Sequence, residues 1–482
     1  MDQANYVLFP SVMAIKSSLV ALALVLPAFA QTYLLFREGG GQGYSGPTQC
    51  VSGSYCNYQN PWYSQCIPGQ GSSSSTPAPT TTPTPTYTSP TSTVDPPTTS
   101  PTQTSGPVDP GTCPTLPSSI TLKSVPRLND PFTFFNGQKV TTKAQWECRQ
   151  EEIFQLVQRY EAGTLPPKPS SVTGSYSGGR LTINVSEAGK SISFQVTISS
   201  PSGTAPFPAI IGYGGGSIPT PAGVAAINFN NDDIAAQVNT GSRGQGKFYT
   251  LYGSGHSASA LTAWAWGVSR IIDALEVTTG HNIDPKRIGV TGCSRNGKGA
   301  LFAGAFDKRV ALTIPQESGS GGAACWRISD QQKQQGTNVQ TASQIITENV
   351  WMSKTFEQYV NQVPMLPFDH HLIAALVAPR GLFVIENTSM EWLGARSTWG
   401  CMKTANKVWG ALGVADRMGV SQVGGHNHCA FPSAQQNELN AFVNKFLKLD
   451  QSANTNVMRT DSSNQNGFDE SYWVDWTTPT LS

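Results

Sequence analysis

A tract rich in proline, serine and threonine divides the 482-residue chain into two unequal parts. Residues 70–112 contain no leucine, isoleucine, lysine or arginine. Such a composition cannot bury a core, and its prolines favour an extended backbone. We therefore expect a stiff, O-glycosylated linker between a small unit at residues 31–69 and a large domain at residues 113–482.

The N-terminal residues have the features of a secretory signal peptide. Met13 is followed by one lysine, an apolar run at residues 19–26 and the small-residue exit Ala-Phe-Ala at 28–30. The apolar run is too short to span a bilayer, and cleavage is expected before Gln31. We expect residues 1–30 to be the signal peptide, with the true start at Met13 and a secreted, extracellular product.

Charge and cysteine content limit the partners and the kind of structure that can be expected. The chain has 31 Lys+Arg against 30 Asp+Glu, so no global field attracts nucleic acid or an anionic membrane, and we expect neither partner. Nine cysteines in a secreted chain predict disulfides, with one odd cysteine to explain. We also expect a monomer.

The small unit is too short for an ordinary hydrophobic core, so we expect disulfides to hold it together. Its exposed aromatic residues Trp62 and Tyr63 suit stacking on pyranose rings, and Asn60 and Gln65 can bind sugar hydroxyls. The alternative is that these rings form the miniature core.

The segments "GGGQGYSGPTQC" and "NPWYSQC" closely resemble the fungal family-one cellulose-binding module. The resemblance implies a small β module that binds cellulose through Trp62, Tyr63 and a third aromatic residue, Phe36. It also implies a Cys50–Cys66 bridge. The family's first cysteine would fall at Gly39, which leaves Cys56 without its partner and accounts for the odd cysteine.

The large domain alternates apolar strand-like runs with helical runs. Strands are predicted at 206–216, 287–294, 310–319, 380–388 and 417–425, and helices at 260–277 and 295–307. This alternation indicates an α/β domain with a mostly parallel sheet, in which functional sites gather at the carboxyl ends of the strands.

The stretch "TGCSRNGKGALF" (291–302) has two interpretations. Read as a P-loop, it lacks the Ser or Thr that must follow Lys298, because Gly299 stands there. Read as a nucleophile elbow, Gly292 relieves the tight turn, Ser294 attacks, and Arg295 offers its backbone N–H to the oxyanion. The second interpretation suits a secreted chain.

A serine nucleophile needs a base and an orienting acid, in the fold order serine, acid, histidine. His426 and His428 both follow the last strand. A Cys293–Cys429 bridge would bring His428 beside Ser294, since bridged Cα atoms lie about 5–6 Å apart. Two residues could be the orienting acid, Glu317 and Glu386, and the sequence around them favours neither.

"GCSRNGKGA", with "PQESG", "FVIENTSMEWLG" and "GGHNHCAFPSAQQ", resembles the signature blocks of the glucuronoyl esterases, carbohydrate esterase family fifteen. The resemblance covers residues 113–482 and implies an α/β-hydrolase fold, a three-layer sandwich around a mostly parallel sheet. It implies Ser294 as nucleophile, His428 as base, Glu317 as acid and Arg295 in the oxyanion hole. The sugar-binding positions that it implies are Lys298, Gln340, Glu348 and Trp392. The bridges that it implies are Cys113–Cys148, Cys293–Cys429 and Cys325–Cys401.

The implied reaction is hydrolysis of the ester between 4-O-methyl-glucuronic acid of glucuronoxylan and a lignin alcohol. It needs no metal or organic cofactor. The alternatives are an acetyl xylan or feruloyl esterase with the same triad, and a catalytically inactive cellulose-binding protein. Asn184 and Asn387 lie in N-glycosylation sequons.

Overall fold

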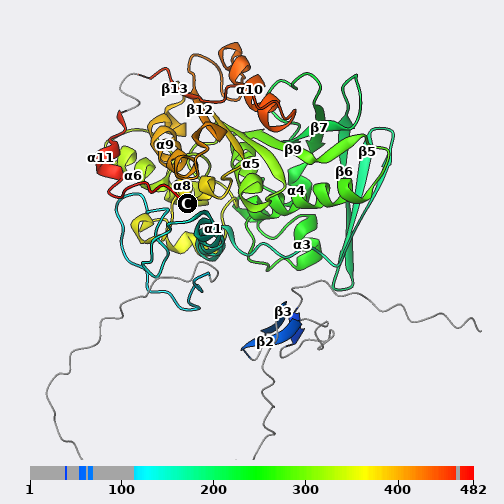
Figure 1. Cartoon of the computed structure of the whole chain (residues 1–482), viewed down its shortest axis with the longest axis horizontal. Coiled ribbons are helices and arrows are strands. Elements are labelled where there is room, and N and C mark those ends of the chain that lie inside the picture. Colours follow the sequence, from blue (N-terminus) through cyan, green and yellow to red (C-terminus); the bar gives the residue numbers. More distant parts are fainter. Residues whose placement is uncertain (1–37, 41–53, 61–62, 69–112, 463–466) are drawn as a thin grey trace, which may run out of the picture. The chain divides into compact units, whose positions relative to one another are not determined.

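The computed structural model describes residues 113–462 and 467–482 with their side chains, and the backbone of three strands nearer the N-terminus (Figure 1). The chain divides into two compact units, Met1–Ser100 and Pro101–Ser482. The predicted signal peptide and linker lie outside the described residues, so both stay predictions.

The small unit contains a three-stranded antiparallel sheet. Its strands are β1 (Glu38–Gly40), β2 (Ser54–Asn60) and β3 (Tyr63–Pro68), in the order β1-β3-β2. Tyr63 and Gln65 occupy alternate positions of β3, and Asn60 pairs with Tyr63 across the hairpin. Phe36, Trp62 and Cys50 lie outside the described residues, and the predicted Cys50–Cys66 bridge with them.

The large unit is built on a ten-stranded sheet in the order β13-β12-β11-β10-β9-β7-β8-β6-β5-β4. The strands from β13 to β8 run parallel to one another, and β6, β5 and β4 continue the sheet as antiparallel strands. The strand bounds are β4 Ser171–Ser177, β5 Arg180–Glu187, β6 Lys190–Ser199, β7 Phe207–Tyr213, β8 Ala225–Phe229, β9 Ile283–Cys293, β10 Val310–Gln316, β11 Gly381–Glu386, β12 Met418–Gln422 and β13 Met458–Thr460.

Helices cover both faces of this sheet, which gives three layers (Figure 1). The helix bounds are α1 Lys143–Val157, α2 Asn231–Ile234, α3 Lys247–Tyr252, α4 Ala260–Val277, α5 Arg295–Phe306, α6 Trp326–Gln334, α7 Ala342–Glu348, α8 His370–Ala375, α9 Ala395–Ala411, α10 Gln436–Phe446 and α11 Glu470–Trp473. α10 packs on one face of the central strands, whereas α4, α5, α8 and α9 belong to the larger core on the other face.

Strand β11 shows how the sheet divides the two cores. Leu382 and Val384 join the larger core, whereas Phe383 and Ile385 pack against α10. Successive side chains of a strand point to opposite faces, so a strand covered on both sides is apolar throughout. Every residue of β11 is buried.

The predicted α/β fold with a mostly parallel sheet is confirmed. The predicted helix at 260–277 coincides with α4, and the predicted strands differ from the observed ones by a few residues at their ends. The antiparallel strands β4 to β6, which the sequence analysis did not place, extend the sheet beyond its parallel part. Within the described ranges, we find no helix of the length and apolarity needed to cross a membrane.

Candidate active site

The serine predicted as nucleophile lies on a sharp turn between β9 and α5. Ser294 has φ 60° and ψ −127°. A Cβ at Gly292 would lie 2.5 Å from the carbonyl oxygen of Asn296, and one at Gly297 would lie 2.6 Å from the carbonyl oxygen of Gln316. The first glycine therefore permits the turn. The second, one position later than in the usual elbow pattern, permits the close approach of α5 to β10.

Glu317 and His428 meet beside this turn. The Cys293–Cys429 disulfide, with Cα atoms 5.7 Å apart, joins the residue before Ser294 to the residue after His428. His428 Nδ1 lies 2.7 Å from Oε2 of the fully buried Glu317, and the backbone N–H of Cys429 donates to the same oxygen at 3.0 Å. His428 Nε2 is buried and has no hydrogen-bond partner among the described residues. The imidazole is thus oriented through Nδ1 and keeps Nε2 available as a base.

Three residues of this site have strained backbone conformations. Ser294 (φ 60°), Glu317 (φ 44°) and Cys429 (φ 67°) are half of the non-glycine residues with positive φ in the described part of the chain. Each such conformation costs on the order of 1–3 kcal/mol and persists only where the surroundings fix it. The fold therefore spends stability to hold these three positions.

Glu386, the other candidate acid, ends the neighbouring strand β11 but does not contact His428. Its carboxyl group is fully buried and accepts hydrogen bonds from the backbone N–H of Asn387 at 3.1 Å and the hydroxyl of Thr398 at 3.0 Å. Burial, together with the nearby charge of Glu317, raises the pKa of Glu386 to about 8. This side chain is therefore a neutral acid at neutral pH, unsuited to pair with an imidazolium.

His426, the other candidate base, is held by neighbouring backbone and amide groups. Its Nε2 lies 2.9 Å from the carbonyl oxygen of Val423, and its Nδ1 lies 3.3 Å from Asn387 Nδ2 and 3.9 Å from Glu317 Oε1. Nδ1 also lies 3.0 Å from the carbonyl oxygen of Asn427, so both ring nitrogens already have hydrogen-bond partners.

Lys298 lies one helical turn after Ser294 and is almost fully buried. Its ammonium group donates to the carbonyl oxygens of Ser318 at 2.5 Å and Ser320 at 2.8 Å. Burial lowers the pKa of Lys298 to about 8, although the nearby charge of Glu348 opposes the shift. An ammonium group has three N–H donors, so one remains for a ligand.

One wall of the site, the polar wall, is formed by Gln340, Glu348 and Trp392. Gln340 Nε2 donates to Glu348 Oε2 at 3.0 Å, and the backbone N–H of Gln340 donates to the carbonyl oxygen of Trp392 at 3.1 Å. The Trp392 ring meets the His428 ring edge-on, with centroids 4.7 Å apart. The four sugar-binding positions implied by the resemblance therefore lie around the serine and the histidine.

Arg295 begins α5 with an exposed side chain whose guanidinium lies 5.7 Å from the ring centroid of Trp351. The backbone N–H groups that open a helix have no partner within it, so Arg295 can direct its own toward an oxyanion. The loop after β7, which supplies a second donor in many related folds, is different here. The N–H groups of glycines 214–216 all donate to backbone carbonyls. Besides its backbone N–H, Arg295 offers its guanidinium as a positive group near this turn.

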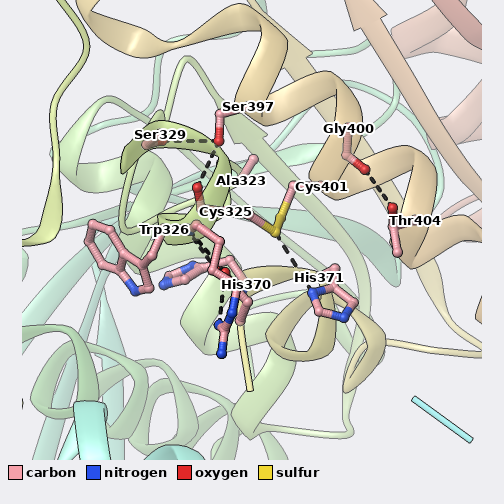
Figure 2. Close-up of a disulfide and its surroundings, with 12 residues drawn as sticks. Ala323, Cys325, Trp326, Ser329, His370, His371, Ser397, Gly400, Cys401 and Thr404 are labelled. Carbon is pink, nitrogen blue, oxygen red and sulfur yellow. Dashed lines mark hydrogen bonds and ion pairs between the residues drawn. A yellow bond between two sulfur atoms is a disulfide. The ribbon is translucent and has the colours of Figure 1, made fainter. Parts of the chain in front are cut away.

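A chain of serine hydroxyls connects the wall of the site to the Cys325–Cys401 disulfide (Figure 2). Ser397 Oγ donates to the carbonyl oxygen of Cys325 at 2.8 Å, and Ser329 Oγ donates to Ser397 Oγ at 3.0 Å. Ser320 Oγ lies 2.7 Å from Ser329 Oγ. Because Ser320 also supplies a carbonyl to Lys298, the disulfide that joins α6 to α9 stabilises the position of the lysine.

The pairing of the cysteines also determines whether they could bind a metal ion. The described residues contain three disulfides, Cys113–Cys148, Cys293–Cys429 and Cys325–Cys401, which join the same cysteines that the resemblance pairs. Two His/Cys groups in this part of the chain have ligand atoms close enough for a metal, one with His428 and one with His371. In each group the two cysteines are bonded to each other, so neither group offers a thiolate.

The sequence analysis missed three residues that shape the site. Trp351 packs beneath both Arg295 and Lys298, at 5.7 Å from each charged group. Ser318 and Ser320 fix the lysine through their carbonyl oxygens. A backbone carbonyl has no sequence signal, and a lone tryptophan in "NVWMSK" has no periodic pattern to mark it.

Comparison with known proteins shows the family to which the chain is similar. Residues 183–413 match the family model for fungal glucuronyl esterase, and residues 39–63 match the fungal cellulose binding domain. The 4-O-methyl-glucuronoyl methylesterase of Hypocrea jecorina is 65% identical over 462 residues, 96% of this chain and 98% of that protein. The solved glucuronoyl esterase catalytic domain of Hypocrea jecorina is 68% identical, with a TM-score of 0.74, and covers 76% of this chain and 100% of its own. A mutant glucuronoyl esterase from Sporotrichum thermophile, solved with methyl 4-O-methyl-beta-D-glucopyranuronate, is 53% identical, with a TM-score of 0.74, and covers 77% of this chain and 100% of its own.

Proposed function

Because the chain belongs to the fungal glucuronoyl esterases, we propose that it hydrolyses the ester between 4-O-methyl-glucuronic acid of glucuronoxylan and alcohols of lignin. The observation that carries the proposal is the Glu317–His428 pair, 2.7 Å apart, bridged through Cys429 to the strained turn at Ser294. This is the constellation that an acyl-transfer reaction requires.

The reaction proceeds through an acyl-enzyme. His428 Nε2 takes the proton of Ser294 Oγ, which attacks the ester carbonyl, while the imidazolium is stabilised by the carboxylate of Glu317. The tetrahedral oxyanion is stabilised by the backbone N–H and the guanidinium of Arg295. The lignin alcohol leaves with the proton from His428, and a water molecule activated by the same imidazole then hydrolyses the acyl-serine.

Substrate recognition relies on the sugar hydroxyls, since an esterified carboxyl group carries no charge. Lys298 has one N–H donor left after its two carbonyl bonds, and Glu348 holds the Gln340 amide in place for further hydrogen bonds. The Trp392 ring, fixed against His428, can pack on the pyranose. An acetyl xylan or feruloyl esterase, the alternative from the sequence, would not need this polar wall.

We further propose that the protein acts outside the cell and binds cellulose. The signal-like N-terminal segment and three disulfides in the large unit suit an oxidising compartment. The small unit matches the fungal cellulose binding domain and contains a three-stranded sheet. Retention of the full chain on crystalline cellulose, compared with a Trp62→Ala variant, tests the second part: equal retention would contradict stacking by this tryptophan.

Hydrolysis of a benzyl ester of glucuronic acid, beside release of acetate from acetylated xylan and of ferulate from a feruloylated sugar, tests the activity. We expect turnover of the first substrate alone, and none by Ser294→Ala or His428→Ala. His426→Ala is the matched control, and we expect it to retain activity because His428, and not His426, lies within hydrogen-bond distance of Glu317. Full activity of Ser294→Ala would contradict the proposed nucleophile, and acetate release as the main reaction would favour the alternative.

A further inference from the structure

A cavity of about 520 Å³ lies at the edge of the sheet opposite to Ser294. Its residues Lys308, Arg380 and Arg417 lie one or two positions before strands β10, β11 and β12, whereas the candidate catalytic residues follow the parallel strands. These three strands have 7, 6 and 5 residues. At a rise of about 3.3 Å per residue, the cavity lies about 20 Å from the site. It is therefore a separate feature of the molecule.

The cavity has positive charges without ion-pair partners. Lys308 is exposed and has no hydrogen bond or ion pair within the described residues, and Arg417 donates only to the carbonyl oxygen of Pro379, at 3.4 Å. The Arg380 guanidinium donates to four backbone carbonyl oxygens and pairs with no carboxylate. Lys143 and Glu147, which also line the cavity, offset each other in formal charge. These charges favour an anionic ligand.

A buried donor also lacks a partner here. Trp146 lines the cavity, is 1% exposed, and its Nε1 has no hydrogen-bond acceptor among the described residues. The Trp146 indole therefore borders the cavity and can report on what binds there. Leu412 and Val414 complete an apolar part of the lining. The cavity thus combines unpaired cations with an apolar surface, and its volume falls within the range of small-ligand sites.

We propose that this cavity binds a carboxylate carried on a six-membered ring, and specifically a free uronic acid group of glucuronoxylan. The carboxylate would face Lys308 and Arg417, and the ring would pack on Leu412 and Val414, beside the Trp146 indole. The general class follows from the cavity itself. The choice of a uronic acid, over an aromatic acid released from lignin, rests on the proposed function, because the proposed substrate polymer carries such groups.

A second contact of this kind would help the enzyme with polymers but not with small esters. Binding of one uronic acid group to the cavity makes binding of another group of the same chain at Ser294 effectively intramolecular, which raises the apparent affinity. The unesterified groups of the polymer would then hold the enzyme close to the esterified ones.

The test uses the full chain with Ser294→Ala, labelled with nitrogen-15 in its indole groups. The indole N–H resonance of Trp146, assigned by its loss in Trp146→Phe, is followed during titration with three ligands: xylotriose bearing 4-O-methyl-glucuronic acid, plain xylotriose and ferulate. We expect a saturable shift with the first ligand and none with plain xylotriose. Lys308→Gln with Arg417→Gln should raise the apparent Kd about tenfold, since two charge-assisted contacts are lost.

The matched control replaces Arg180 and Lys190, exposed on the β5–β6 hairpin, with glutamine. It removes the same formal charge and should leave the Kd unchanged. Absence of a Trp146 shift with both acids, or equal effects of the two double variants, would overturn the proposal. A shift with ferulate alone would overturn the uronic acid assignment.

In a background with Ser294 intact, the Lys308→Gln, Arg417→Gln double variant should hydrolyse the benzyl ester normally. Loss of benzyl ester hydrolysis by the unmodified enzyme would refute the proposed function without affecting the titration.

Discussion

Replacement of Glu317 by glutamine isolates the contribution of its charge to turnover. The carboxylate contacts His428 Nδ1 at 2.7 Å and is fully buried, so solvent screens it little. With the charge centres about 4 Å apart and an effective dielectric constant of about 20, the attraction to an imidazolium is about 4 kcal/mol. At 1.36 kcal/mol for each factor of ten, we expect kcat to fall about 10³-fold.

Glu386→Gln is the matched control, since it makes the same change in an equally buried acid on the neighbouring strand. Because the pKa of Glu386 is raised to about 8, this group is already neutral at pH 6, and glutamine preserves both its charge and its shape. In benzyl ester assays at pH 6 we expect kcat to change less than about threefold, an activation effect below 1 kcal/mol. If Glu386→Gln lost as much activity as Glu317→Gln, the assignment of the acid would be refuted.

The same control variant has a signed effect on stability. The folded pKa of Glu386, about 8, lies above its ordinary value of 4.5, so the folded state retains a proton that the unfolded chain releases. The wild type should therefore lose stability as the pH rises from about 4.5 to about 8, by at most about 1.4 kcal/mol per pH unit. Glu386→Gln should lack this loss, so its Tm relative to the wild type should increase with pH. A constant difference in Tm would contradict the neutral state of this carboxyl group.

Three further predictions concern other parts of the domain. The pKa of Lys298 is lowered to about 8 by burial, so its third N–H donor should be lost above that pH; KM for the ester should rise there, and Lys298→Met should abolish this pH dependence. Asn184 is exposed and Asn387 is fully buried, so mass spectrometry of the protein from a host that attaches N-glycans should find an N-glycan at the first sequon and none at the second. Removal of the Cys293–Cys429 bridge, which closes 136 residues, should cost about 5 kcal/mol by loop-closure entropy and lower kcat as well; an unchanged kcat would mean that the loop bearing His428 is positioned without it.

The sequence was sufficient to predict the sheet and the turn at Ser294 because both have local signals. Alternating strands and helices indicated the parallel sheet, and Gly292 two positions before Ser294 indicated the turn. The position of His428 followed from a single adjacency, that of Cys429 to the histidine and of Cys293 to the serine. A covalent bridge fixes two distant backbone positions, so cysteines beside candidate residues carry information on tertiary structure.

The choice between Glu317 and Glu386 had no local signal. Both residues follow apolar strands, and β10 and β11 are neighbours in the sheet. They differ in what surrounds them, since Glu317 contacts an imidazole 111 positions away, whereas Glu386 accepts hydrogen bonds from a hydroxyl and from backbone N–H groups. The protonation state of Glu386 depends on burial in the folded domain, which a linear pattern does not encode.

The neutral state of Glu386 has a consequence for catalysis. In the proposed mechanism Lys298 and Arg295 supply two positive charges near the ester, and Glu317 and Glu348 supply two negative ones. An ionised Glu386 would leave the site with a net negative charge, which would oppose the developing oxyanion and attract the proton of the imidazolium. Since burial keeps this carboxyl group protonated, the site stays balanced before the reaction and the full attraction of Arg295 acts on the transition state. In the proposed mechanism the burial of Glu386 therefore contributes to the electrostatics of ester hydrolysis, although no hydrogen bond joins its side chain to the serine or the histidine.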